Sequence, residues 1–301
     1  MTPIGYKYNH AWGDRHDACL CVGYRWASDG PMVPELTESN VLRFGPNGQV
    51  QRLLRLHGTI TSLWRSSAGL IVAATIDGRL LVARDGELPL RWTTFQAAGG
   101  LSCVWGLNED LLFAAGRSGG KPCLLRWRGQ DWSEVPCDGF PVSMHGIRPD
   151  CLYAVGYDGY IGRWTGSALE RVGSPIQSPL SSVFVAGDDE IYACGPTGTL
   201  LDGTVYGWVE RLASEHTLYA VAKHGGQVWI AAGDAGLFTL SGDALVPVRP
   251  DLRARSLKAG ERLLITAPDV VIDTADGKAF TGYQLDGLVS VTDGVPPAWL
   301  A

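Results

Sequence analysis

The segment Cys151-Leu-Tyr-Ala-Val-Gly-Tyr-Asp-Gly-Tyr-Ile-Gly-Arg-Trp-Thr-Gly-Ser-Ala-Leu-Glu-Arg-Val172 contains three apolar runs, separated first by an Asp-Gly turn and then by a Thr-Gly-Ser turn. Short apolar runs joined by glycine-containing turns are typical of antiparallel hairpins. The same order recurs in residues 70–92, 111–135, 191–212 and 228–248. The sequence therefore predicts a repeated unit of short antiparallel strands.

One position, at the predicted end of the second strand of each unit, sets the register of the repeat. It falls at Gly23, Thr75, Gly116, Gly156, Gly195, Gly233 and Thr274, with spacings of 52, 41, 40, 39, 38 and 41. Three residues beyond the last six lies a glycine, which a turn with positive φ favours. These are Gly78, Gly119, Gly159, Gly198, Gly236 and Gly277. Four strands at this period predict an all-β fold, a seven-bladed β-propeller of four-stranded antiparallel blades.

We expect one β-propeller domain over residues 1–301, because the units fill the chain. The predicted blades span 1–56, 57–98, 99–140, 141–178, 179–214, 215–252 and 253–301. Two segments depart from the repeat, an insertion within 24–40 in blade one and a long connection at 249–260 into blade seven, which carries Arg253, Arg255 and Lys258. Loops on a rigid scaffold often hold function, so we expect function in these segments.

The units at 156–166 and 126–135 also carry a family resemblance. Their Gly-Tyr-Asp-Gly and Arg-Trp-Arg-Gly-Gln-Asp-Trp patterns resemble bacterial propeller repeats of the kelch-like, sialidase-like and photosystem-assembly-factor-like groups. The Asp-box of sialidases and the Gly-His and Trp-Asp dipeptides of WD40 blades are absent. The resemblance covers nearly the whole chain and implies an architecture, not a chemistry, because propellers host many unrelated activities.

Composition narrows the classes of function. The net charge is −6, which disfavours binding to nucleic acid or an anionic membrane, since both require a basic surface. The N-terminus has no basic region followed by an apolar stretch, and no apolar run reaches membrane-spanning length. The seven cysteines include no Cys-x-x-Cys pair and are interpreted as reduced core residues. We expect a cytoplasmic monomer that needs no cofactor.

A series of large side chains recurs eleven residues before each register position, on the predicted first strands that line the central channel. The series reads Trp12, Trp64, Trp105, His145, Phe184, Ala222 and Leu263. Such a ring could stack on a sugar or a peptide, or it could pack blade against blade. We favour packing, because aromatic residues at one repeat position bury large areas between repeats. His145 is then a core or channel histidine.

Two sets of polar residues suggest chemistry. His10, Asp14, His16 and Asp17 could bind a divalent metal, but they lack the helical spacing of a zinc motif, so a polar turn is favoured and no metal site is expected. A second set could supply the acids of a glycosidase or calcium ligands, and it lies at turns predicted on the binding face. Hairpin turns also select aspartate for their backbone geometry, which we favour. The second set is Asp77, Asp158, Asp234 and Asp276.

No nucleophile elbow, phosphate loop or His-Glu-x-x-His motif occurs, so no catalytic residue is predicted. We expect a non-catalytic scaffold that binds another protein, and specifically an immunity or accessory protein that neutralises a toxin. A carbohydrate- or ester-active enzyme or lectin that uses the central channel remains the alternative. The predicted partner-binding residues are Trp26, Asp29, Met32, Asp77, Arg117, Tyr157, Asp158 and Asp234.

Overall fold

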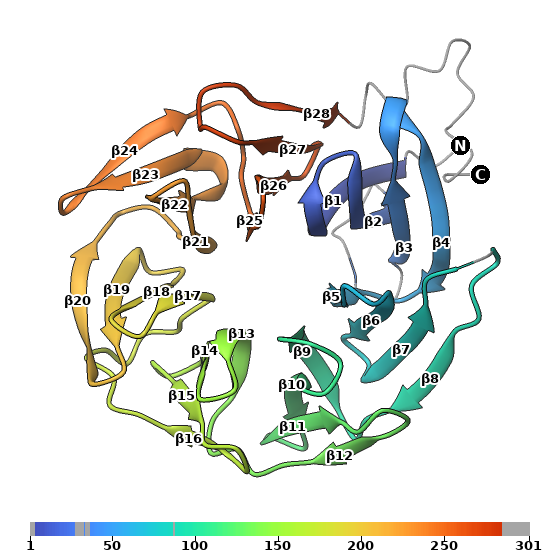
Figure 1. Cartoon of the computed structure of the whole chain (residues 1–301), viewed down its shortest axis with the longest axis horizontal. Coiled ribbons are helices and arrows are strands. Elements are labelled where there is room, and N and C mark those ends of the chain that lie inside the picture. Colours follow the sequence, from blue (N-terminus) through green and yellow to red (C-terminus); the bar gives the residue numbers. More distant parts are fainter. Residues whose placement is uncertain (1–3, 28–32, 34–36, 87, 285–301) are drawn as a thin grey trace.

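The computed structural model describes residues 4–27, 33, 37–86 and 88–284, which form seven antiparallel sheets arranged in a ring (Figure 1). Each sheet has four strands in sequence order, and the first strand of each lies nearest the centre of the ring. The prediction of an all-β, seven-bladed propeller is confirmed. Within the described residues the only helical elements are two 3-10 turns, η2 (Pro46–Gly48) and η3 (Gly233–Ala235). Neither has the length and hydropathy needed to cross a bilayer.

The first four blades follow the chain in order. Blade one holds β1 (Ile4–Arg15), β2 (Ala18–Ala27), β3 (Glu38–Phe44) and β4 (Val50–His57). Blade two holds β5 (Ile60–Arg65), β6 (Leu70–Thr75), β7 (Arg79–Arg84) and β8 (Thr93–Gln96). Blade three holds β9 (Gly100–Gly106), β10 (Leu112–Ser118), β11 (Lys121–Trp127) and β12 (Trp132–Glu134). Blade four holds β13 (Pro141–Arg148), β14 (Cys151–Gly156), β15 (Ile161–Trp164) and β16 (Leu169–Arg171).

The last three blades complete the ring. Blade five holds β17 (Ser182–Gly187), β18 (Glu190–Cys194), β19 (Thr199–Thr204) and β20 (Gly207–Ala213). Blade six holds β21 (Ala220–His224), β22 (Gln227–Ala231), β23 (Leu237–Ser241) and β24 (Ala244–Arg249). Blade seven holds β25 (Ser256–Ala259), β26 (Leu263–Ala267), β27 (Val270–Thr274) and β28 (Thr281–Gln284).

The hydrophobic core lies between the blades. Every residue of β6 and of β14 is buried, because neighbouring blades cover both faces of these second strands. Such strands are apolar throughout rather than alternating. The buried side chains form seven clusters, and each cluster is built from two adjacent blades. One cluster joins Tyr8 and Phe44 of blade one to Leu264 and Val271 of blade seven.

Where a repeat has both glycines, as in blade four, the two have different physical causes. A Cβ on Gly156 would lie 1.8 Å from the Phe140 carbonyl oxygen, so the close approach of the inner strand excludes a side chain. Gly159 instead has a φ of 62°, in the left-handed region that favours glycine. Glycine at the register position therefore allows two strands of a blade to approach closely, and the glycine three residues later allows the hairpin turn.

Blade seven departs from the predicted register. Thr274 ends the third strand, β27, and Leu263 lies on the second strand, β26, rather than on the first. Lys258 of the inner strand β25 takes the channel position instead. It pairs with Leu264 of the second strand, as Trp12 of the inner strand of blade one pairs with Leu20. The motif at Thr274 was assigned to the wrong turn of the blade because the side chains of Thr-x-Asp-Gly stabilise the turn locally. Thr274 Oγ1 bonds Asp276 as Thr75 Oγ1 bonds Asp77. This turn forms after a second or a third strand alike.

The ring closes by contacts between complete blades, because blade seven supplies all four of its own strands. The Tyr8 backbone N–H donates to the Pro268 carbonyl at 2.8 Å. The Tyr283 hydroxyl accepts from the Gly48 N–H at 2.9 Å and donates to the Gly45 carbonyl at 3.2 Å. In Figure 1 the red C-terminal blade accordingly lies beside the blue N-terminal one.

The turns define two faces of the ring. Because strand direction alternates within each blade, the turns between second and third strands lie on one face, which we call the upper face. The turns between first and second strands, and between third and fourth strands, lie on the lower face. β2 ends and β3 begins at the upper face, so the blade-one insertion joins them there.

Candidate functional site

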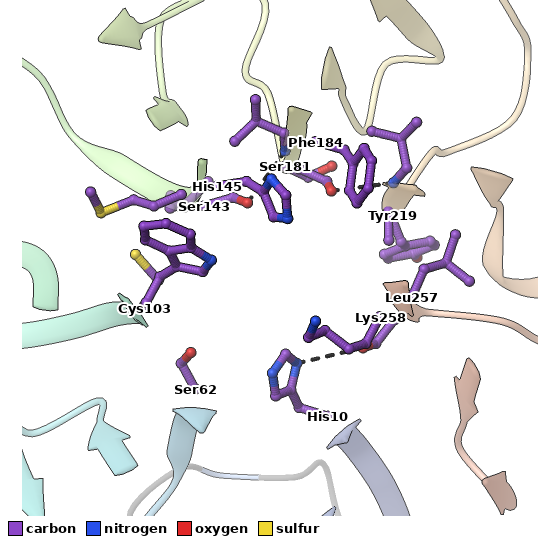
Figure 2. Close-up of a pocket in the computed structure, with 18 of the residues that line it drawn as sticks. His10, Ser62, Cys103, Ser143, His145, Ser181, Phe184, Tyr219, Leu257 and Lys258 are labelled. Atoms are coloured by element: carbon purple, nitrogen blue, oxygen red, sulfur yellow. Dashed lines mark hydrogen bonds between the residues drawn. The ribbon is translucent and has the colours of Figure 1, made fainter. Parts of the chain in front are cut away.

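A cavity of about 210 Å³ lies among the inner strands at their upper-face ends, and we call it the upper chamber (Figure 2). The first residues of the inner strands line its outer part, and the large channel residues form its base. Figure 2 shows His145 and Phe184 on one side of the chamber and His10 and Lys258 on another. The base comprises Trp12, Trp105, His145, Phe184 and Lys258.

A ring of small polar side chains lies one layer above this base. Its hydroxyls bond to the next blade: Ser62 Oγ donates to the Val104 carbonyl at 3.3 Å, and Ser182 Oγ accepts the Val221 N–H at 3.2 Å. Sequence reasoning missed this ring, although its members fall two residues before the channel series in most blades. The ring comprises His10, Ser62, Cys103, Ser143, Ser182 and Ser256.

Two further serines of the chamber bridge adjacent blades. Ser102 Oγ lies 3.0 Å from the Ala115 carbonyl of its own blade and 2.7 Å from the Pro141 carbonyl of the next. Ser181 Oγ repeats the arrangement with Cys194 and Leu218, at 3.2 and 2.9 Å. These hydroxyls satisfy polar backbone atoms where two blades meet.

The aromatic channel series also links blades. The Trp12 indole N–H donates to the Arg65 carbonyl at 2.9 Å, and the Trp64 indole N–H donates to the Gly106 carbonyl at 2.8 Å. His145 stacks on Phe184 with ring centroids 4.5 Å apart, and its Nδ1 accepts the Val185 N–H at 3.0 Å. These contacts agree with the interpretation of the series as packing between blades.

The chamber is electrostatically positive. Burial, with a smaller contribution from the nearby charge of Lys258, lowers the pKa of His10 to about 4 and that of His145 to about 3. Burial raises the pKa of Cys103 to about 12. At neutral pH the histidines are therefore neutral and the thiol is protonated. The charged groups in the described lining are the cations Arg255 and Lys258, since that lining includes no aspartate or glutamate.

Both cations rest against aromatic rings. The Lys258 Nζ lies 4.8 Å from the Trp12 ring centroid and donates to the Ala259 carbonyl at 2.9 Å. Burial lowers the pKa of Lys258, and Asp14 partly opposes the shift. The Arg255 guanidinium lies 4.7 Å from the Tyr219 ring centroid. The sequence predicted both residues in the long connection into blade seven. That both line the channel is seen only in the folded structure.

A second cavity, of about 680 Å³, lies at the lower-face end of the inner strands. Trp12, Trp105, His145 and Lys258 line both cavities, so the two adjoin at this layer. The lower cavity contains carboxylates, whereas the lining that the structure describes for the upper chamber contains none. Its charged residues are Asp14, Arg65, Glu109, Asp110 and Lys258. The two ends of the channel therefore differ in charge.

The predicted partner-binding residues that the structure describes lie at the upper face, on five blades. Asp29 and Met32 lie outside the described residues. Arg117 and Tyr157 come together: the Arg117 guanidinium lies 4.5 Å from the Phe140 ring centroid and 5.7 Å from that of Tyr157, whose side chain is half exposed. The others are spread around the ring, at Trp26, Asp77, Asp158 and Asp234.

Local contacts account for several of these residues. Trp26 lies with its ring centroid 5.8 Å from the Lys7 Nζ. Asp77 forms an ion pair with Arg79 at 2.7 Å. Partial burial raises the pKa of Asp77, but hydrogen bonds from Arg79 and Thr75 outweigh it, so the net pKa is lowered. Asp158 has a φ of 55°, a left-handed turn conformation that aspartate tolerates.

The four turn aspartates do not share one face, contrary to the sequence-based expectation. Asp77, Asp158 and Asp234 lie in turns between second and third strands, but Asp276 lies between β27 and β28 and so on the lower face. Asp276 accepts the backbone N–H groups of Lys278 and Ala279 at 2.9 and 3.0 Å, as a turn residue does. The register error in blade seven explains the misplacement.

The N-terminal histidines and aspartates point to different neighbours. His10 faces the upper chamber, His16 contacts Asp273 of blade seven, and Asp17 pairs with Arg15 at 3.0 Å. Across the described part of the chain, no three histidine, cysteine or carboxylate side chains converge as a metal site would require.

Comparison with known proteins places the sequence near one curated relative. No protein-family model matches the chain. The "Immune protein Tsi7" of Pseudomonas aeruginosa is 31% identical over 199 residues, which cover 60% of this chain. The match spans 62% of the length of that relative.

Solved structures resemble the fold at low sequence identity. The WD40 propeller domain of Doa1 has a TM-score of 0.61 at 11% identity, and the match covers 87% of this chain and 94% of that one. A YCF48 structure with a bound D1 peptide has a TM-score of 0.58 at 14% identity, covering 76% and 81%. PorZ of Porphyromonas gingivalis has a TM-score of 0.55 at 13% identity, covering 75% and 33%. At these identities the likeness concerns the propeller architecture alone.

Proposed function

We propose that this chain is a non-catalytic immunity protein that binds and neutralises a toxin protein through its upper face. The observation that carries the proposal is the 31% identity to a protein named for immunity, over 60% of the chain. A rigid ring that presents loops on one face is also suited to protein recognition.

The upper face offers an anchor of the kind that dominates protein interfaces. Tyr157 is 50% exposed, and the Arg117 guanidinium lies 5.7 Å from its ring centroid and 4.5 Å from that of Phe140. Tyrosine and arginine are enriched among residues that contribute most to binding, and a pre-stacked pair loses little conformational freedom when a partner docks. We therefore assign the centre of the interface to blades three and four, with Trp26, Asp77, Asp158 and Asp234 in its periphery.

Co-expression tests this proposal. The protein encoded beside this chain in its native genome is expressed alone, with this chain, and with the variant Arg117→Ala/Tyr157→Ala. We expect this chain to restore growth and to co-purify with the toxic protein, and we expect the variant to lose both properties. A matched control is Arg128→Ala/Tyr206→Ala, which removes an arginine and a tyrosine from lower-face turns. Tyr206 is 91% exposed.

The control should protect as well as the unaltered chain. Protection that survives the upper-face change but is lost with the lower-face change would place the interface on the other side of the ring. Absence of both protection and complex formation, with a partner shown to be toxic, would contradict the immunity function itself.

A further inference from the structure

We propose that the upper chamber is a binding site for a single small oxyanion, a carboxylate or a phosphate, held between Arg255 and Lys258. An anion would occupy this site whether or not a protein docks on the upper face. Three features of the chamber support the assignment: its charge, its hydrogen-bonding groups and its size.

The charge of the described lining has one sign. Arg255 and Lys258 contribute cations, and no carboxylate faces them there. The ion pairs around blade seven engage other cations, namely Arg249, Arg253 and Arg262. Burial of a cation is favoured by a nearby negative charge, and the described lining of the upper chamber supplies none. Asp14, which partly opposes the lowered pKa of Lys258, lies in the lower cavity. An anion in the chamber would supply that charge.

The pKa values of neighbouring titratable groups are lowered by these same cations. The charge of Lys258 lowers the pKa of His10 and of His145, in addition to the larger effect of burial. Burial, together with the charge of Arg255, lowers the pKa of Lys7. Each of these groups is therefore displaced towards its neutral form by a cation that lines the chamber.

The chamber also presents donors without acceptors. The Arg255 Nε is buried and has no hydrogen-bond partner among the described residues. The Ser143 and Ser182 hydroxyls accept backbone N–H groups, so their own O–H groups can donate to an oxyanion, as can that of Tyr219. A buried guanidinium N–H without an acceptor is costly, so an acceptor at this point would stabilise the fold.

The size of the cavity limits the ligand. At about 210 Å³ the chamber is smaller than the ~300–1,000 Å³ that holds drug-sized ligands. It suits a phosphate ion or the carboxylate end of a peptide or side chain. Trp12, Trp105, His145 and Lys258 mark the layer at which this small cavity meets the lower one.

Calorimetric titration tests the site with defined probes. Inorganic phosphate, triglycine with a free carboxyl terminus, and triglycine amide are titrated into the full chain at constant ionic strength, with chloride as the balancing ion. We expect saturable binding of phosphate, of triglycine or of both, and none of the amide. Phosphate binding alone identifies a free ion as the ligand, whereas triglycine binding alone identifies a carboxylate carried on a chain.

The variants Arg255→Ala and Lys258→Met remove the two cations separately. Each should weaken binding by at least about tenfold, as expected for one charged hydrogen-bonding partner. Arg253→Ala is the matched control: it removes a cation two residues from Arg255 that lies outside the chamber and pairs with Asp269 at 3.4 Å. It should leave the affinity unchanged.

A second measurement keeps the test decisive if a variant fails to fold. In the unaltered protein, a bound anion should raise the pKa of His10 and of His145, which histidine ring NMR signals follow as phosphate or triglycine is added. The signals of His57, outside the chamber, serve as the reference. No saturable binding of either probe, or binding that is unchanged in both Arg255→Ala and Lys258→Met, would overturn the assignment.

Discussion

His16 and Asp273 stand 257 positions apart in the chain, yet the His16 backbone N–H and its ring Nδ1 each lie 2.6 Å from Asp273 Oδ2. The Asp273 side chain is fully buried, and Arg262 bonds its other oxygen. Burial raises the pKa of Asp273, but the bonds from His16 and Arg262 outweigh it, so the net pKa is lowered. This carboxylate therefore connects the first blade to the last.

We expect Asp273→Asn to lower the free energy of unfolding by about 3 kcal/mol, since removing one partner of a buried ion pair leaves the other uncompensated. Asp251→Asn is the control, because Asp251 also pairs with an arginine, Arg249, but its side chain is 63% exposed. Its loss should cost less than about 1 kcal/mol. Chemical denaturation of both variants gives the comparison, and equal losses would show that the blade-closing contact contributes no more than a surface pair.

Gly156→Ala should destabilise the fold by about 1–3 kcal/mol, the usual cost of overpacking. The added Cβ would lie 1.8 Å from the Phe140 carbonyl oxygen and would force the inner strand of blade four to move. Gly173→Ala is the control, since nothing lies within 4 Å of a Cβ there. Thermal unfolding should separate the two variants, and similar melting temperatures would refute the steric explanation of the repeat glycine.

Acidification should destabilise the protein through its channel histidines. Their pKa values, about 4 for His10 and about 3 for His145, lie below the usual value of about 6.5. Between pH 6.5 and 4 the unfolded chain therefore binds protons that the folded chain does not, and stability falls as the pH falls. Each histidine contributes about 1.4 kcal/mol per pH unit within that window.

The variant His10→Gln/His145→Gln should be less sensitive to pH in that window, whatever its stability at pH 7. Unfolding free energies measured by denaturant at pH 7 and pH 5 provide the readout. A variant whose stability falls as steeply as that of the unaltered chain would assign the acid sensitivity to other groups.

Asp158 allows turn geometry to be separated from charge. Asn also adopts the left-handed conformation observed here, so Asp158→Asn should change stability by no more than about 0.5 kcal/mol, whereas the β-branched Asp158→Val should cost about 1–3 kcal/mol. If the Asn variant also binds the partner protein more weakly, the charge of Asp158 contributes to the interface. Unaltered binding would show that Asp158 serves only the geometry of the turn.

The sequence predicts the blades well because their determinants are local and repeated. Apolar second strands recur around the ring, and a hairpin glycine follows them in blades two to six. Each of these signals needs only its neighbours in the chain to be recognised. The predicted register of blade seven was wrong for the same reason. The Thr-x-Asp-Gly turn at Thr274 is equally local, so it does not indicate which turn of the blade it forms. A count along the inner strands would have selected Lys258.

The candidate site was less predictable, because its residues come from different blades. Arg117 and Tyr157 lie 40 residues apart and meet only when blades three and four pack. The upper chamber gathers side chains from all around the ring, and its positive sign depends on which carboxylates face elsewhere. Neither property can be read from spacing within one repeat.

Each hydrophobic cluster belongs to two blades, and the last cluster returns to the first blade. A linear array of repeats has two terminal units with a single neighbour, and these fray first. This ring has no such unit: detaching any one blade exposes two clusters at once. Partial unfolding from an end is therefore suppressed, and hydrogen exchange should occur at similar rates in the second strands of all seven blades.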